Sequence, residues 1–163
     1  MMKQRNRQTG FTLIETMIVL VIVGISVSIG LPMMQGMLTS SLAKRTTGLF
    51  ELDLNFTRSS AVSRGETVRM SPRDNDIANG WVIIAQRIDG SQETLRERGS
   101  LDKKVSITSP DGLDSIAFRA TGQIETGGTI VIRTSGCQGN QDKSFTLLNS
   151  GQIAVTELAC KEE

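Results

Sequence analysis

The sequence of 163 residues is long enough for one ordinary domain plus an appendage, and its 38% hydrophobic and 21% charged content is globular rather than disordered. The 18 basic and 17 acidic side chains almost cancel, so no overall charge favours nucleic acid or an anionic membrane. The sequence has neither histidine nor tyrosine. It therefore lacks the commonest metal ligand and the most usual general base at neutral pH.

The N-terminal region combines a cationic leader with a membrane-spanning segment. Lys3, Arg5 and Arg7 stand in residues 1–10 without an acid, and residues 11–34 carry a single charge, Glu15. A helix of this length spans a hydrocarbon core of about 30 Å, and the basic leader predicts that its N-terminal side stays in the cytoplasm. A carboxylate at the centre of a membrane helix costs roughly 2.5–3.5 kcal/mol, so Glu15 indicates a function.

Three kinds of N-terminal signal fit parts of this pattern. A secretory signal peptide fits the basic start and the small residues at 26 and 28, but it would place Glu15 inside its apolar region. A plain signal anchor explains neither Gly10 nor Glu15. The stretch Gly-Phe-Thr-Leu-Ile-Glu at residues 10–15 resembles the class III signal of type IV pilins and pseudopilins, which also has this leader length and this apolar run.

The resemblance implies a role for each residue of the motif. Prepilin peptidase cuts such signals after the glycine, here Gly10, and methylates the new N-terminal residue, here Phe11. Glu15 is then expected to pair with the freed amine of a neighbouring subunit, because an ion pair in a low dielectric is partly compensated and a lone carboxylate is not. The alternatives are a protonated Glu15 or one that lies near the cytoplasmic interface without a partner.

Gly24, Gly30 and Pro32 interrupt the apolar segment. Proline removes a backbone hydrogen bond and clashes with the preceding turn, so a kink near Pro32 is expected. The family resemblance implies that this stretch of helix can loosen when the subunit packs into a filament. A bent helix without that role is the alternative.

Residues 35–65 are predicted to continue as the amphipathic half of the same helix. Apolar residues recur there at near-helical spacing, and Gly65 is a good C-terminal stop. Arg45, Arg58 and Arg64 are expected on the solvated face. The apolar stripe comprises Leu38, Leu42, Leu49, Phe50, Leu52, Leu54, Phe56 and Ala61.

Residues 66–163 are predicted to form a β-rich globular head. Short β-prone runs alternate with turn signals such as Asp89-Gly90 and Gly127-Gly128, which favours antiparallel sheet. A long helix followed by strands is an α+β arrangement in which the sheet covers the apolar stripe of the helix, and the resemblance implies the pilin fold. The runs are ETVRM, GWVIIAQ, ETLRE, VSITS, SIAFRA, GTIVIR, SFTLL and QIAVTEL.

The head extends the resemblance to the H-type pseudopilins (GspH) and the FimT/FimU-type minor pilins. Cys137 and Cys160 would be buried thiols in a cytosolic protein, but export of the head favours a disulfide between them. That bond would close a loop of about 23 residues and contribute roughly 3 kcal/mol. The similar stretches are residues 58–65, 80–84, 117–122 and 150–155.

The sequence predicts no catalytic activity, no cofactor and no bound metal. Without histidine, serine and cysteine lack their usual activating base, and two cysteines are too few for a thiolate zinc cage. Asp74-Asn75-Asp76 misses the EF-hand spacing and predicts a turn before the strand of Trp81.

DNA binding is disfavoured. FimT-type proteins that take part in DNA uptake carry Gly-Arg-x-Arg near the C-terminus, whereas this sequence has Gly151-Gln152-Ile153-Ala154 at the matching turn. Removal of the leader leaves 15 basic and 17 acidic side chains, and contacts to phosphate dominate affinity for DNA.

The sequence therefore predicts a minor type IV pilin, a structural subunit that is incorporated into a type IV pilus, or primes it, near the tip. The alternatives are an H-type pseudopilin of a type II secretion system, a DNA-uptake pilin and, with least support, a membrane-tethered enzyme. The expected partners are prepilin peptidase, the other minor pilins, the major pilin and the inner-membrane assembly platform. The expected location is the bacterial inner membrane, with a single pass and a periplasmic head, and then the filament.

Overall fold

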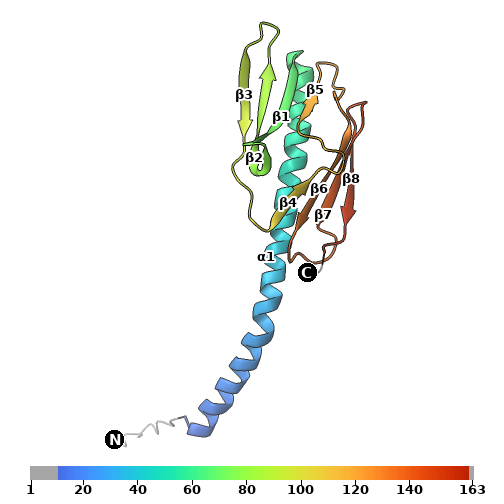
Figure 1. Ribbon diagram of the computed structural model, residues 1–163. Helices are drawn as coiled ribbons and strands as arrows, with labels where there is room; N and C mark the ends of the chain where they lie inside the picture. Colours follow the sequence, from blue (N-terminus) through green and yellow to red (C-terminus); the bar gives the residue numbers. More distant parts are fainter. Residues whose placement is uncertain (1–10, 162–163) are drawn as a thin grey trace, which may run out of the picture. The chain divides into compact units, whose positions relative to one another are not determined.

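In the computed structural model, which describes residues 11–161 apart from the side chains of residues 31–33, the chain forms a long helix and eight strands (Figure 1). Helix α1 runs from Leu13 to Arg64. The chain divides into two compact units, Met1–Gln35 and Gly36–Glu163. The first unit contributes the apolar part of α1, and the second contains the rest of α1 and all the strands.

The start of α1 is set by a capping residue. The Thr12 hydroxyl accepts a hydrogen bond from the Glu15 N–H at 3.3 Å, and the Thr12 carbonyl accepts one from the Thr16 N–H at 3.2 Å. A threonine followed three residues later by a glutamate is the sequence pattern of a capping box. Part of the motif at residues 10–15 therefore has a structural role, which is to begin the helix at Leu13.

The apolar part of α1 satisfies its own polar groups. The hydroxyls of Thr16, Ser26 and Ser28 each donate to a helix carbonyl three or four residues earlier, at 2.8 Å. An 18-residue window of the helix has a mean hydropathy of 2.5, and none of it is buried inside the protein. By length and composition this helix can cross a membrane, because its hydroxyls need no water there.

The strands of the head form two antiparallel sheets. Sheet A has the order β3 (Gln92–Glu97), β2 (Asp76–Gln86), β1 (Thr67–Arg73), β5 (Ile116–Phe118). Sheet B has the order β4 (Val105–Thr108), β6 (Gly128–Thr134), β7 (Asp142–Leu147), β8 (Ile153–Leu158). Each of the eight β-prone runs of the sequence overlaps one of these strands. The single predicted sheet is instead two sheets, because turn signals place strands without pairing them.

Both sheets pack on the second half of α1, and Phe50 lies at the centre of the core. Its ring meets Trp81 of sheet A edge-on, with ring centres 5.5 Å apart, and Phe145 of sheet B at 5.2 Å. All three side chains are buried, and such edge-to-face pairs add roughly 0.5–1.5 kcal/mol beyond the area they bury. The helix and both sheets therefore share one hydrophobic core.

The helix ends where the sequence predicted. Gly65 has a φ of 67°, and the Glu66 N–H donates to the Ala61 carbonyl at 3.3 Å. This is the Schellman arrangement, in which a left-handed glycine lets the chain turn back and satisfy a free carbonyl.

The buried face of the helix differs from the predicted apolar stripe. Leu38 and Leu52 are 64% and 54% exposed, while Thr47, Asp53 and Thr57 are completely buried. The two threonine hydroxyls donate to helix carbonyls, at 2.9 Å for Thr47 and 2.6 Å for Thr57, so they are buried without an unpaired polar group.

The turn predicted at Asp74-Asn75-Asp76 is confirmed, but it is one residue shorter, because Asp76 already belongs to β2. Asp74 and Asn75 have φ angles of 49° and 59°, and Arg73 pairs with Asp76 across the hairpin. Two central residues with positive φ make a type I′ turn, which suits the twist of a hairpin. Strand β2 consequently begins at Asp76 rather than at Gly80.

Candidate functional site

The first candidate surface is the exposed apolar segment of α1. Every side chain from Phe11 to Gly30 is exposed, including Phe11 at 82% and Leu20 at 69%. Soluble monomers rarely expose a continuous apolar surface of this size, so this segment is suited to lipid or to other apolar helices. Glu15 is the one charged residue in the segment, and none of the ion pairs of the described region involves it.

The other residues predicted for processing and flexibility lie close by in the chain. Gly10 is outside the described residues, and Phe11 precedes the first helical residue by two positions. Gly24 and Gly30 lie within α1, where a side-chain carbon added at either position would meet no atom within 4 Å. Position 32 is helical, but the Pro32 side chain is outside the described part. Loosening of this stretch stays a prediction.

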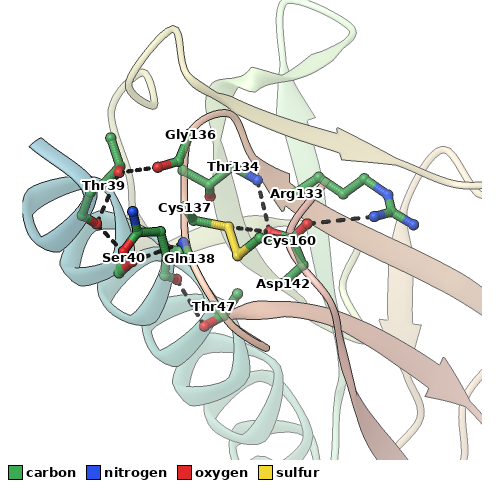
Figure 2. Close-up of a disulfide and its surroundings, with 12 residues drawn as sticks. Thr39, Ser40, Thr47, Arg133, Thr134, Gly136, Cys137, Gln138, Asp142 and Cys160 are labelled. Atoms are coloured by element: carbon green, nitrogen blue, oxygen red, sulfur yellow. Dashed lines mark hydrogen bonds and ion pairs between the residues drawn. A yellow bond between two sulfur atoms is a disulfide. The ribbon is translucent and has the colours of Figure 1, made fainter. Parts of the chain in front are cut away.

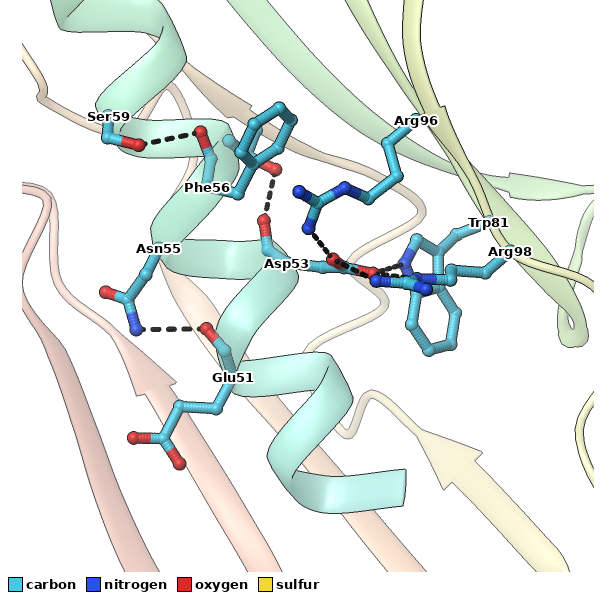
Figure 3. Close-up of polar contacts among 9 residues, drawn as sticks. Glu51, Asp53, Asn55, Phe56, Ser59, Trp81, Arg96 and Arg98 are labelled. Atoms are coloured by element: carbon cyan, nitrogen blue, oxygen red, sulfur yellow. Dashed lines mark hydrogen bonds and ion pairs between the residues drawn. The ribbon is translucent and has the colours of Figure 1, made fainter. Parts of the chain in front are cut away.

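The second candidate feature is a buried carboxylate that joins the helix to sheet A. Asp53 lies on α1 and is completely buried. Its Oδ2 accepts hydrogen bonds from Trp81 Nε1 at 2.9 Å and from Arg98 Nε at 2.8 Å, and its Oδ1 accepts from Arg98 Nη2 at 3.1 Å and from Arg96 Nη1 (Figure 3). Arg96 also lies over the Phe56 ring, 3.8 Å from its centre, which is a cation–π contact.

The electrostatics of this cluster favour the ionised carboxylate. Burial by itself would raise the pKa of Asp53, but hydrogen bonds from Arg98, Arg96 and Trp81 outweigh it and hold the pKa below its usual value. The hydrogen bond with Asp53 likewise raises the pKa of Arg98. Asp53 is therefore a fixed anion that links α1 to β2, β3 and the residue after β3.

The third candidate feature is a disulfide-bonded turn that contacts α1. Cys137, after β6, and Cys160, after β8, form the expected disulfide (Figure 2). The Cys160 N–H donates to the Gly139 carbonyl at 2.8 Å. The Gly136 carbonyl accepts a hydrogen bond from the Thr39 hydroxyl, and the Gln138 N–H donates to Ser40 Oγ at 3.0 Å.

Gly36 fits the same contact. A side-chain carbon at this position would come within 2.5 Å of the Gln138 side chain, so glycine permits the close approach of the turn. We call Ser135–Gln141, together with its disulfide, the disulfide turn. It contacts Gly36, Thr39 and Ser40, which are the first residues of α1 in the unit Gly36–Glu163.

Asp142 lies against the disulfide turn and is 1% exposed. Its Oδ1 accepts a hydrogen bond from the Thr134 N–H at 2.9 Å, and its Oδ2 lies 3.5 Å from Arg133 Nη1. Burial raises the pKa of this carboxyl above its usual value, because the distant arginine compensates it incompletely. Asp142 and the two sulfur atoms lie close together, but the sulfurs are bonded to each other and offer no thiolate to a metal.

A fourth contact joins α1 to the turns after β5 and β7. Arg58 Nε donates to the Gly122 carbonyl at 3.2 Å, so Arg58 is not simply on the solvated face as predicted. Gly151 has a φ of 84°, and a side-chain carbon there would collide with the Gly122 carbonyl oxygen. The residues that follow, from Gln152 to Ala154, bring no cation to this turn.

Sequence reasoning missed Asp53 and Asp142, the two buried carboxylates of the described residues. Asp53 stands between Phe50 and Leu54 in the predicted stripe, and an acid in an apolar stripe is a signal for a buried partner. Its partners Arg96 and Arg98 are two positions apart at the end of β3, and this spacing places both side chains on the same face of the strand. Asp142 gave no comparable signal.

The architecture and the exposed apolar helix define the class of pilin-like subunits. The fold is similar to that of the type IV minor pilin FimU of Pseudomonas aeruginosa, with a TM-score of 0.53, 20% identity, and coverage of 76% of this chain and 95% of that one. It is also similar to the minor pseudopilin EpsH of the Vibrio cholerae type 2 secretion system, with a TM-score of 0.53, 15% identity, and coverage of 72% of this chain and 96% of that one.

The family follows from the sequence itself. Residues 46–151 match the family described as type II transport protein GspH, and residues 5–31 match the prokaryotic N-terminal methylation motif. The chain belongs to the GspH family. It is also 27% identical over 157 residues to the type IV major alpha-pilin of Moraxella bovis, a match that covers 96% of this chain and 86% of that protein.

Proposed function

We propose that this protein is a minor type IV pilin, a structural subunit that prepilin peptidase cleaves after Gly10 and methylates at Phe11. The observation that carries the proposal is the position of the motif at residues 10–15, at the start of an exposed apolar helix that leads into a pilin head. The family is one of structural subunits, and we infer that the protein has no catalytic role and no cofactor.

The parts of the chain follow from this proposal. Residues 1–10 are the leader, 11–34 the membrane and assembly half of the helix, 35–65 its amphipathic half, and 66–163 the head. The subunit waits in the bacterial inner membrane with the head in the periplasm and then enters the filament, near its tip. A disulfide in the head suits that compartment, since disulfides persist in the periplasm and are rare in the cytosol.

Assembly depends on Glu15 in this proposal. The residue lies in the first turn of α1, where it can meet the amine of a neighbouring subunit across a helix interface. Gly24, Gly30 and Pro32 supply the stretch that loosens as helices pack. The partners are prepilin peptidase, other minor pilins, the major pilin and the inner-membrane assembly platform.

The second candidate is an H-type pseudopilin of a type II secretion system. The description of the matched family and the likeness to EpsH favour it, whereas the likeness to FimU and to the Moraxella bovis pilin favours the pilus. DNA uptake has no comparable support, because the turn at Gly151 lacks the two arginines of the Gly-Arg-x-Arg motif.

A clean deletion of the gene separates the candidates when surface pili, exported enzymes and transformation are scored together. We expect loss of pili with secretion intact. Loss of enzyme secretion with pili intact would establish the pseudopilin instead, and loss of transformation alone would favour the DNA-uptake pilin. Mass spectrometry of the mature protein should find methylated Phe11 at its N-terminus.

Glu15→Ala tests the assembly step. The variant should insert into the membrane and be cleaved, because neither process needs the ion pair, but its incorporation into filaments should fall. Immunoblots of membranes and of sheared filaments measure the two pools, and Thr16→Ser, one residue away, is the matched control. Normal incorporation of Glu15→Ala would contradict the proposed pairing.

A further inference from the structure

A cleft in the head lies between the two sheets. Its volume is about 750 Å³, within the range of roughly 300–1,000 Å³ that is usual for ligand sites. The cleft is bounded by the end of β1, the β1–β2 turn, the start of β2, strand β4, the loop from 109 to 115, and β6. All of these segments belong to the unit Gly36–Glu163.

The floor of the cleft is apolar. Ile130 of β6 is buried, and Ile77, Ile107 and Leu113 are partly buried and pack against the core of the head. Partly exposed aliphatic side chains in a concave surface can bury another apolar side chain, at about 25 cal/mol for each Å² removed from water. The floor therefore suits an aliphatic group.

The rim of the cleft is acidic. Asp76 and Asp114 line it, and Asp74 and Asp111 are neighbours of lining residues in the chain. None of the four takes part in any ion pair of the described region. The nearby arginines are already paired, Arg69 with Glu125 at 3.0 Å and Arg73 with Glu97 at 2.8 Å. The rim thus carries uncompensated negative charge.

The wall formed by the loop from 109 to 115 is held in place. Ser109 Oγ donates to the Thr129 carbonyl at 3.1 Å and accepts from the Leu113 N–H at 2.9 Å. The Asp111 carboxylate accepts from the Thr129 N–H at 2.7 Å. A site whose walls are already ordered binds with a smaller entropy cost.

The cleft also borders an edge strand. Strand β4 is one of the two edge strands of sheet B and pairs with β6 alone, and its residues Ile107 and Thr108 line the cleft. An edge strand presents backbone N–H and C=O groups at regular intervals, which an extended peptide can match.

We propose that this cleft binds an extended polypeptide segment of a neighbouring subunit, with a lysine or arginine at Asp76 and Asp114 and an aliphatic side chain on the floor. An apolar floor, an acidic rim and a strand edge together match a cationic, apolar peptide better than they match an anionic lipid or nucleic acid, which the rim repels. The identity of the partner as a filament subunit rests on the proposed function, but the peptide chemistry does not.

The direct test uses the full-length protein in detergent micelles and two fluorescent peptides, Val-Lys-Ile-Arg-Val and Val-Glu-Ile-Glu-Val. The basic peptide should bind and the acidic one should not. Asp76→Asn with Asp114→Asn should weaken binding roughly 3- to 10-fold, the size expected for two partly exposed ion pairs. Leu113→Ser should weaken it to a similar degree, with no change in its dependence on salt.

The matched control is Asp89→Asn with Asp102→Asn, which removes the same charge from exposed carboxylates that do not line the cleft. An equal loss of binding in the control, or equal binding of both peptides, would overturn the proposal. A thermal shift with calcium chloride that the cleft variant abolishes, without any peptide binding, would mean a cation site instead. Self-association through these residues in sedimentation would mean a second copy instead.

A measurement in cells separates this proposal from the proposed function. The Asp76/Asp114 variant should be cleaved and enter the membrane normally but reach filaments less, while Glu15→Ala keeps its peptide affinity and also fails to reach them. Peptide binding together with absence of the wild-type protein from filaments would contradict the proposed function and leave the cleft chemistry standing. Normal incorporation of the Asp76/Asp114 variant would show that the partner of the cleft is not a filament subunit. Loss of incorporation without any peptide binding would contradict the cleft alone.

Discussion

Replacement of Asp53 by asparagine should destabilise the head strongly. The change keeps the shape of the side chain, and the amide oxygen can still accept a hydrogen bond from Trp81. Arg96 and Arg98, however, lose their anionic partner, and they donate three of the four hydrogen bonds that Asp53 accepts. Loss of one partner from a buried ion pair costs about 3–5 kcal/mol. The two arginine side chains are 29% and 33% exposed and can regain water, so we expect a loss of about 2–4 kcal/mol.

The loss should depend on pH. The folded-state pKa of Asp53 is lowered, so its stabilisation is fully present above the unfolded pKa of roughly 3.9 and disappears as the pH falls through the folded pKa. The difference in unfolding free energy between wild type and Asp53→Asn should therefore be largest at neutral pH and shrink in acid.

The assay is urea unfolding of the full-length protein in detergent micelles, at pH 7 and at several acidic values. Trp81 is the single tryptophan of the chain and contacts Asp53 directly, so its fluorescence reports the region that is perturbed. Glu157→Gln is the control, because it removes the same charge from an exposed position of β8 that takes part in none of the ion pairs of the described residues, and its unfolding should match wild type. Equal stability of Asp53→Asn and wild type, or a difference that does not shrink in acid, would refute the electrostatic explanation.

Two further predictions concern the disulfide turn. Burial raises the folded-state pKa of Asp142. The stability of Asp142→Asn relative to wild type should therefore rise as the pH increases from the unfolded to the folded pKa of Asp142. A relative stability that falls over this range, measured in the same urea titrations, would contradict the prediction. Replacement of both Cys137 and Cys160 by serine should cost about 2–4 kcal/mol and accelerate amide hydrogen exchange at residues 36–40 more than at 50–61, because the turn contacts the helix there. Equal acceleration of both segments would show that the turn does not hold the helix locally.

Local signals in the sequence predicted most of the elements. The helix stop at Gly65 depends on one residue that tolerates a positive φ, and the β1–β2 turn depends on Asp74 and Asn75, which tolerate it nearly as well. Each strand has a β-prone run bounded by turn residues. Such signals act within a few residues, so they can be recognised without knowledge of the fold.

Features that join distant segments were not predictable in the same way. Asp53 meets Arg96 and Arg98 across more than 40 positions of the chain, and three separated segments enclose the cleft. The division of the strands into two sheets likewise depends on pairings such as β1 with β5, which no turn connects directly. By contrast, the motif at residues 10–15 is contiguous, and the sequence alone was sufficient to identify it.

If the chain is cleaved after Gly10 as proposed, the cap at Thr12 has a consequence for the chemistry of the new N-terminus. Because α1 begins at Leu13, Phe11 and Thr12 precede the helix, and the proposed cut before Phe11 does not fall within a helical turn of the described residues. Cleavage there would leave the new ammonium group within two residues of the positive end of the helix dipole, where a positive charge is unfavourable. A nearby carboxylate relieves that repulsion. The helix that presents the new amine thus also increases its need for an acidic partner.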